Sequence, residues 1–156
     1  MIEKNVEAAI ITAIENLGLP NIDIVGLWQP TATGIVKATE KSNSDAALVI
    51  SIPPKSFDTF GICEVSLEVS MTLTVRVEKD ATGSKLLQYV EPINAMLESW
   101  NMSEEHDELE ALITEDFYPG GIRVNAGSGP TWDPSSKTWS VEFSFTVRGL
   151  LQHEHN

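Results

Sequence analysis

The sequence is poor in the residues that most often carry enzymatic chemistry. It contains one cysteine, Cys63, and three histidines, His106, His153 and His155. A single cysteine excludes an internal disulfide, and the place of Cys63 in an alternating apolar pattern favours a buried core residue. Nucleophilic catalysis needs a Ser, Cys or Thr beside a base, but there is no Gly-x-Ser-x-Gly motif and two histidines lie in the last four residues. We therefore predict no catalytic residues and expect that the protein is not an enzyme.

Ligands for a metal or an organic cofactor are equally scarce. His153 and His155 stand two residues apart on a terminal segment, and a designed site needs further ligands that converge from elsewhere in the fold. The acids at 104–108 lack the order of a calcium-binding loop. The segment 127–130 is not followed by the Gly-Lys-Ser/Thr of a phosphate-binding loop, and its composition predicts a plain hairpin loop. The sequence predicts neither a metal nor a cofactor.

Basic residues are outnumbered, with 10 Lys and Arg against 23 Asp and Glu, for a formal net charge of -13. This balance disfavours a direct, non-specific grip on nucleic acid or on an anionic membrane. Positions 86 to 122 hold nine acids and no base, which predicts a solvated acidic segment, with a cation site or a basic partner as the alternative. No run of about 18 apolar residues predicts a membrane span, and the N-terminus lacks the pattern of a signal peptide. We expect a cytoplasmic protein.

The sequence is rich in strict alternation of apolar and polar residues. From Cys63 to Glu78 every odd position is apolar and every even position is polar. Successive side chains of a strand point to opposite faces, so the pattern predicts one strand over 62–78 with one buried face. At roughly 3.3 Å per residue it would span about 50 Å, far beyond a usual strand. Residues 138–148 repeat the pattern, and we expect both strands in one antiparallel sheet with their apolar faces together, which places Val69 and Phe143 in the core.

Two segments have the apolar spacing of amphipathic helices. The first covers 3–17 and is ended by Gly18, and the second covers 84–100, where Pro92 breaks or kinks the helix or begins its second half. Weaker signals predict a strand buried on both faces at 46–52, shorter strands at 22–28, 35–39 and 122–125, a short acidic helix from Ser103 to Ile113, and loops through 117–137. We expect 101–136 to be the most mobile segment and to carry partner contacts.

Together these elements predict an α+β fold. A mostly antiparallel sheet with two long amphipathic strands is expected to be covered on one face by the N-terminal helix and the helix that follows the first long strand. The length fits a single domain, which we place at 1–151, with a flexible C-terminal tail at 152–156.

Six residues are candidates for an interface. The polar side of the first long strand carries short side chains and no Lys, although Lys commonly defends exposed strands, so another subunit could pack there; a solvated sheet face is the alternative. These strand candidates are Ser66, Ser70, Thr72 and Thr74. Trp28 and Trp132 lie beside proline-containing loops and are either residues at the edge of the core or interface anchors. Trp100 and Trp139 follow the apolar patterns and are expected in the core.

The order of these elements resembles that of the tail terminator and tail-completion (head–tail joining) proteins of bacteriophages and prophages. The resemblance covers most of the chain by element order: a helix at Glu3–Leu17, a strand at Ile24–Trp28, a loop at Gln29–Gly34, a long strand at Ile62–Val77, a helix at Ser84–Trp100 and a closing strand at Lys137–Gly149. Pro92 and the acidic stretch that follows depart from the family's simplest pattern.

The resemblance implies a structural protein of virion assembly that forms a ring, usually a hexamer, at the head–tail joint or the end of the tail tube. Its partners would be further copies of itself and tail-tube or neck proteins. Its location would be the cytoplasm of the host bacterium and then the virion. The charge of -13 would suit a passage through which DNA slides without adhering. The alternative is a ligand-binding or adaptor α+β domain that uses the acidic segment 101–118 to bind a basic partner.

Overall fold

The computed structural model describes residues 1–29, 44–57, 64–76, 83–102 and 108–152. Cys63, the three histidines and the expected strand at 35–39 lie outside these residues. The described elements in chain order are α1 (Ile2–Glu15), β1 (Ile22–Gly26), β2 (Ala46–Ser51), β3 (Ser56–Phe57), β4 (Glu64–Arg76), α3 (Ser84–Met102), the 3-10 helix η3 (Glu108–Leu112), β5 (Phe117–Asn125), β6 (Thr131–Asp133) and β7 (Thr138–Leu151).

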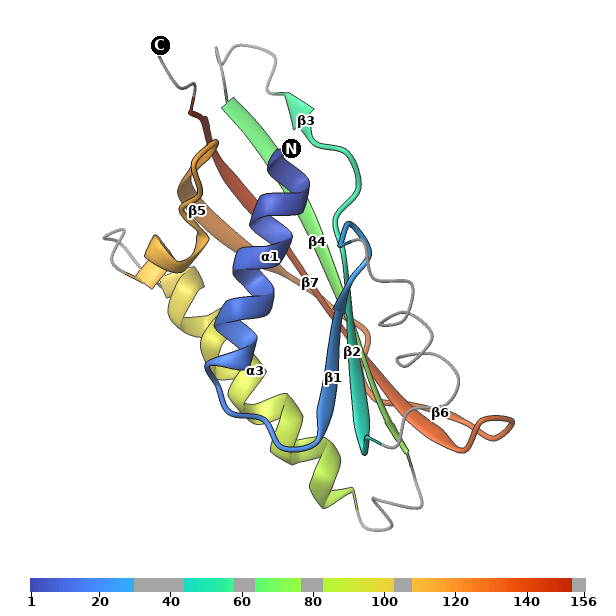
Figure 1. Cartoon of the computed structure of the whole chain (residues 1–156). Helices are drawn as coiled ribbons and strands as arrows, with labels where there is room; N and C mark the ends of the chain where they lie inside the picture. Colours follow the sequence, from blue (N-terminus) through green and yellow to red (C-terminus); the bar gives the residue numbers. More distant parts are fainter. Residues whose placement is uncertain (30–43, 58–63, 77–82, 103–107, 153–156) are drawn as a thin grey trace.

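The strands form one mixed sheet in the order β1-β2-β4-β7-β5, to which β3 adds beside β4 and β6 beside β7. Only β1 and β2 are parallel; the other pairs are antiparallel. All 13 residues of β4 pair with β7 without a shift in register, from Glu64 opposite Leu150 to Arg76 opposite Thr138. Figure 1 shows the two strands running together along the length of the molecule. The predicted pairing of the two alternating segments is confirmed.

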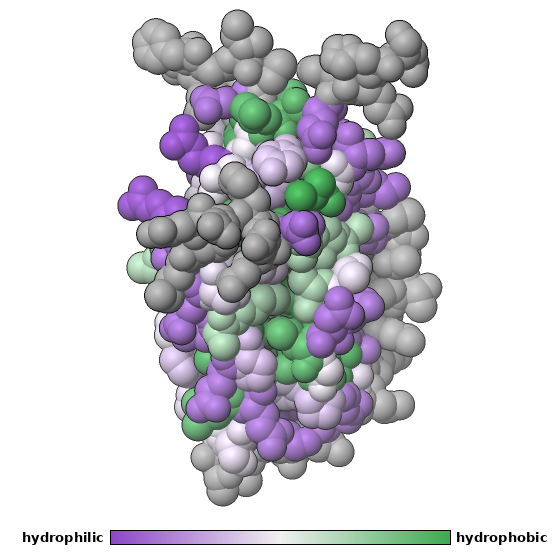
Figure 2. Space-filling view, turned by 90° about the vertical axis from the view of Figure 1, so that its left-hand side faces the viewer, coloured by the Kyte–Doolittle hydropathy of each residue, from purple (hydrophilic) through white to green (hydrophobic). Residues whose placement is uncertain are grey.

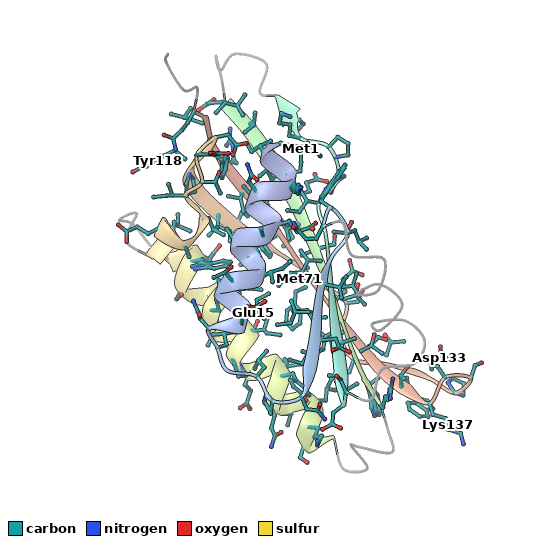
Figure 3. All side chains as sticks on the ribbon, in the orientation of Figure 1. Met1, Glu15, Met71, Tyr118, Asp133 and Lys137 are labelled. Carbon is teal, nitrogen blue, oxygen red and sulfur yellow. The ribbon has the colours of Figure 1, made fainter. Side chains whose placement is uncertain are left out.

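Helices α1 and α3 lie on the same side of this sheet (Figure 1). Every odd-numbered residue of β4 from Val65 to Val75 is fully buried beneath them, since its exposed fraction is 0%. Val69 and Phe143 both lie in this core, as predicted, and Figure 3 shows Met71 in its middle. The arrangement is the expected α+β fold: the apolar stripes of two helices and one face of a sheet remove each other from water.

The two helices largely follow their sequence signals. Gly18 ends α1 with a φ of +69°, a left-handed conformation that glycine adopts without steric cost. Pro92 does not break the second helix, because α3 continues through it to Met102. Trp100 is buried and its ring packs edge-on against Phe145, with centroids 6.1 Å apart, whereas Trp139 is only partly buried.

The main error of the sequence-based prediction concerns residues 117–137. We expected loops there with a strand at 122–125, but β5 has nine residues and pairs with β7 along its length. A shift in register between Pro119 and Gly121 marks a bulge, which lets an edge strand accommodate a proline that has no N–H to donate. The sequence pattern did not predict the full length of this strand, because proline and glycine are both rare inside regular sheets.

Two smaller expectations also need correction. In place of the end of the helix expected over 103–113, the structure has the 3-10 helix η3, which buries Leu109 and Leu112 but leaves Ile113 37% exposed. Gln152 was assigned to the flexible tail, but its backbone N–H donates to the carbonyl of Asp116 at 2.9 Å. The folded structure therefore extends at least to Gln152.

Candidate functional site: the open face of the sheet

The face of the sheet opposite α1 and α3, called here the open face, carries the even-numbered residues of β4 and β7. It brings together the four candidates of the first long strand, Ser66, Ser70, Thr72 and Thr74, all of them partly or fully exposed. Two of their four partners on β7 are also small: Ser70 faces Ser144 and Thr74 faces Ser140, whereas Ser66 faces Arg148 and Thr72 faces Glu142. The middle of the open face therefore combines hydroxyl groups with the carboxylates of Glu68 and Glu142, in cross-strand pairs that can hydrogen bond.

Trp28 does not belong to the open face. It follows β1, its indole N–H donates to the carbonyl of Ile52, and its backbone N–H donates to Oε1 of Glu7 at 2.9 Å. The ring is partly buried against the core. The structure therefore supports packing at the edge of the core for Trp28 and gives no separate support to its role as an interface anchor.

Trp132 lies on the hairpin formed by β6 and β7, which extends beyond the helices and ends near the labelled Asp133 and Lys137 (Figures 1 and 3). Its ring is 40% exposed and lies 5.5 Å from the ring of Trp139. Trp132 pairs with Trp139. Odd-numbered residues of β7, such as Trp139, point to the helix side of the sheet, and directly paired residues share a face, so both tryptophans lie on the helix side. The fold thus separates Trp132 from the four hydroxyl residues. At the turn, Ser135 N–H donates to Asp133 Oδ1 at 2.9 Å, and this bond lowers the pKa of Asp133.

A hollow that the sequence analysis did not predict lies at one end of the open face, where β5 joins β7. It has a volume of about 560 Å³, and two arginines and a threonine hydroxyl line it. The lining residues that matter below are Glu64, Gly121, Arg123, Thr146, Arg148 and Leu150. We call this hollow the arginine pocket. The polar alternation of 138–148 already placed Arg148 and Thr146 on the open face, but Arg123 joins them only through the pairing of β5.

The edge of the sheet beside this pocket is partly closed to further strands. Asn101 of α3 accepts a hydrogen bond from the backbone N–H of Val124 at 3.1 Å. Pro119 supplies no N–H, and the bulge that follows it disturbs the ladder. Figure 2 shows the side of the molecule on which β5 lies in Figure 1, with hydrophobic and hydrophilic residues interspersed. An added strand could therefore not use the N–H of Val124, which is already bonded, and would find no N–H at Pro119.

Two buried carboxylates on α1 were also missed. Glu7 has an exposed fraction of 0%; its Oε1 accepts from the Trp28 N–H at 2.9 Å and from Nε2 of Gln29 at 3.4 Å, while its Oε2 has no partner among the described residues. Burial raises the pKa of Glu7, and the hydrogen bond from Trp28 acts in the opposite direction. The carboxylate lies against Gly26, where a Cβ atom would come within 2.1 Å of Oε1. Glu7 thus holds the backbone where the chain leaves β1.

Ion pairs hold two lysines to the fold. Nζ of Lys55 lies 3.4 Å from Oε1 of Glu3, which is buried on α1, and Lys85 pairs with the buried Asp45.

Within the described ranges, no three His, Cys, Asp or Glu side chains are grouped so that they could hold a metal ion. Among the same residues, no helix is both long and apolar enough to cross a membrane.

The side chains of the open face offer hydroxyl donors and acceptors, the carboxylates of Glu68 and Glu142, two guanidinium groups and a few apolar contacts. No protein-family model matches this sequence, and no curated protein is significantly similar to it.

Proposed function

We propose that this protein is a self-associating structural subunit of the kind found among the tail terminator and tail-completion proteins of bacteriophages, and that its copies close into a ring. The observation that carries the proposal is the unbroken ladder of β4 and β7. One side of the ladder packs on the helices, while the other presents short hydroxyl side chains, interrupted by Glu68 and Glu142, along its middle. A second protein surface can cover the hydroxyl part of such a face at low cost.

The low cost follows from the side chains themselves. Ser and Thr have few rotamers to lose on burial, whereas Lys, Arg or Glu would lose far more conformational entropy. Each hydroxyl can both donate and accept, so it can adapt to the polar groups of a partner. β4 and β7 contain no Lys, so no lysine side chain would lose its conformational freedom when a partner covers the middle of the face.

The geometry favours packing through the face over addition of strands at the edge of β5. Asn101 and Pro119 occupy or remove backbone donors along that strand, as described above. The hairpin of β6 and β7 extends beyond the helices and carries the exposed Trp132. One subunit can therefore contact the open face of a neighbour through this hairpin, which is a surface different from its own open face. Contacts between two different surfaces generate a ring when the rotation that relates successive copies leads back to the first copy.

The proposal places the ring in a virion, with tail-tube or neck proteins as its partners and the cytoplasm of the host bacterium as its place of assembly. Support for this part comes from the order of elements: an N-terminal helix, a long strand, a second helix and a closing long strand. The charge of -13 on each copy is compatible with a channel that repels DNA.

Sedimentation velocity over a wide range of protein concentration tests the proposal. We expect the wild-type protein, alone or with a tail-tube protein, to form one closed oligomer. Thr72→Lys places a long charged side chain in the middle of the open face and should leave monomers. Because it also reduces the net negative charge, general repulsion between copies cannot explain such a loss.

Gln88→Lys, on the exposed side of α3, is the matched control, since it changes the charge equally outside the open face. We expect it to assemble as the wild type does. A wild-type protein that remains monomeric at all concentrations and beside a tail-tube protein would contradict the proposal. Equal assembly by Thr72→Lys and Gln88→Lys would contradict the role of the open face.

A further inference from the structure

The hairpin of β6 and β7 presents a large aromatic side chain that the fold leaves partly in water. Trp132 is 40% exposed, although its ring lies only 5.5 Å from that of Trp139. The hairpin extends beyond the helices, and all three residues of β6 are exposed (Figure 1). Burial of such a ring stabilises a complex, and tryptophan is among the residues that contribute most to binding energy at interfaces. Trp132 is therefore placed to anchor a partner.

The tip of this hairpin has no formal net charge. Residues 131–139 contain one acid, Asp133, and one base, Lys137. The carboxylate of Asp133 accepts a hydrogen bond from the N–H of Ser135 at 2.9 Å, which holds the turn in shape. Two copies of charge -13 repel each other, whereas this neutral, projecting segment can approach a second copy with little repulsion.

The arginine pocket is electrically balanced, which suits it to a neutral group. Arg123 and Arg148 are offset by two acids of β4: Glu64 lines the pocket, and Glu68 faces Thr146, the cross-strand partner of Arg123. An isolated ion would find no excess of opposite charge there. A neutral occupant, by contrast, can enter and leave these charges balanced.

The pocket exposes backbone and apolar side chains to its occupant. Three of its lining residues have no side chain to cover the backbone: Gly120, Gly121 and Gly149. A Cβ atom built at Gly121 would meet nothing within 4 Å, so the space beside this residue is open to a close approach. Ile122 and Leu150 add apolar surface, and Leu150 is 47% exposed. An aromatic ring can lie against such a surface.

The size of the pocket and one of its arginines also fit an indole ring. The volume of about 560 Å³ lies within the range of cavities that hold small organic groups. Arg123 is exposed, and a guanidinium group placed over the face of a tryptophan is attracted to the ring while it keeps its charge. Arg123 can therefore favour an aromatic ring while Glu68 balances its charge.

The hairpin and the pocket lie at opposite ends of β7. Thr138, which follows the hairpin turn, and Arg148, which lines the pocket, are ten residues apart, about 33 Å along an extended strand. Trp132 lies on the helix side of the sheet, whereas the pocket belongs to the open face. The two cannot meet within one copy, but they can meet between successive copies in a head-to-tail contact, which is the kind that generates rings.

We infer that Trp132 of one copy inserts into the arginine pocket of a second copy, where its ring lies against the glycine backbone beside Arg123. The inference rests on the self-association proposed above and identifies the contact that joins neighbouring subunits. Both surfaces are electrically balanced in a strongly acidic chain, one projects where the other is hollow, and they lie at opposite ends of the same strand.

Sedimentation velocity with full-length variants, under the conditions in which the wild type assembles, tests the inference. Trp132→Ala removes the anchor, and we expect the dissociation constant of the oligomer to rise about tenfold or more, as for a tryptophan at the centre of an interface. Leu87→Ala is the control, because it removes an apolar side chain that is 54% exposed on α3, outside both surfaces. It should change the constant by less than about twofold.

A second variant blocks the pocket and keeps the anchor. Gly121→Leu fills the hollow, and the open space around this residue means that the fold should tolerate it with an unchanged melting temperature. Alone it should assemble as poorly as Trp132→Ala. An equimolar mixture of the two variants should form dimers but no larger oligomer, because only one intact anchor and one intact pocket are available to each pair. Such dimers would also show that both variants are folded.

The outcomes separate the two proposals. If the wild type assembles but Trp132→Ala matches Leu87→Ala, the Trp132 contact is overturned while self-association stands. If both variants assemble poorly and their mixture stays monomeric, Trp132 and the pocket do not meet, and the inference is overturned as well. If the wild type never assembles, the proposed function is overturned and with it the second copy as the partner.

Salt gives a further readout. Added NaCl should not weaken association of the wild type, because the contact has no net charge and salt screens the repulsion between the acidic copies. Strong weakening by NaCl would contradict a neutral contact and overturn the inference.

Discussion

The two faces of the β4–β7 ladder share one backbone and one register but have opposite roles. On the helix side, Val69 and Met71 have exposed fractions of 0% and pack in a continuous core. On the open face, Ser70 and Thr72 alternate with them along the same strand and remain accessible. A pleated strand therefore separates a buried face from an accessible one by position parity alone. Substitutions on the open face should leave the core packing intact, whereas substitutions beneath the helices should not.

The largest expected effect concerns the covered face. Val69→Asp would place an unpaired charge among apolar side chains, and we expect it to lower the free energy of unfolding by about 4 kcal/mol or more, enough to unfold many domains. Thr72→Asp, on the open face, should cost less than about 1 kcal/mol in the monomer. Urea unfolding of the monomers measures both values. Similar losses for the two variants would mean that the faces are assigned wrongly.

A smaller effect is expected where α1 meets the end of β1. Gly26→Ala would bring a methyl group against the Glu7 carboxylate, and we expect a loss of about 1–3 kcal/mol from this overpacking. In a Glu7→Ala background the carboxylate is gone, so the same substitution should cost less. A double-mutant cycle in urea should give an interaction energy of about 1 kcal/mol or more between the two sites. Additive losses would show that the contact with the Glu7 carboxylate is not the reason why a larger side chain at position 26 destabilises the protein.

The buried carboxylate of Glu7 should also make stability depend on pH. Its pKa is raised in the folded protein by burial, so the folded state binds a proton that the unfolded state releases. The protonated form stabilises the fold fully below the unfolded-state pKa, and this contribution is lost as pH rises through the raised folded-state pKa. Glu7→Gln imitates the protonated form and should lack this loss.

The melting temperatures of Glu7→Gln and the wild type should therefore be compared across the acidic range up to neutral pH. We expect the variant to gain relative to the wild type as pH rises, while the open-face variant Thr72→Gln, which adds no titratable group, should follow the wild type. A constant difference between Glu7→Gln and the wild type at every pH would contradict the assignment.

The smallest effect is expected at the C-terminus. The chain ends with His153-Glu154-His155-Asn156, and we predict that no metal or cofactor is needed for folding. Removal of 153–156, which keeps the hydrogen-bonded Gln152, should change the melting temperature by less than about 2 °C, with or without a chelator. A fall in the melting temperature of about 10 °C or more would contradict this prediction and indicate that His153 and His155 are metal ligands.

The candidate site was predictable only where it lies within single strands. The alternation in β4 was sufficient to place Ser66, Ser70, Thr72 and Thr74 together, because side-chain parity is a local property of the backbone. The arginine pocket was not predictable, because Arg123 and Arg148 are separated by 25 positions and meet through the pairing of β5 with β7. The face on which Trp132 lies was not predictable for the same reason, since it depends on the pairing of Trp132 with Trp139.

The sequence by itself determined the α+β class, the two helices, the two long strands and which of their sides is buried, since apolar periodicity acts over a few residues. Only the tertiary structure decided the strand order, the nine-residue β5 and the burial of Glu3 and Glu7 on α1. These features depend on contacts between distant segments, which pay for the entropy of closing long loops and can override local propensity. A proline and two glycines stand in β5 although strands disfavour them, because the assembled sheet accommodates a bulge there. Glu3 and Glu7 can be buried because distant segments supply hydrogen-bond donors to their carboxylates.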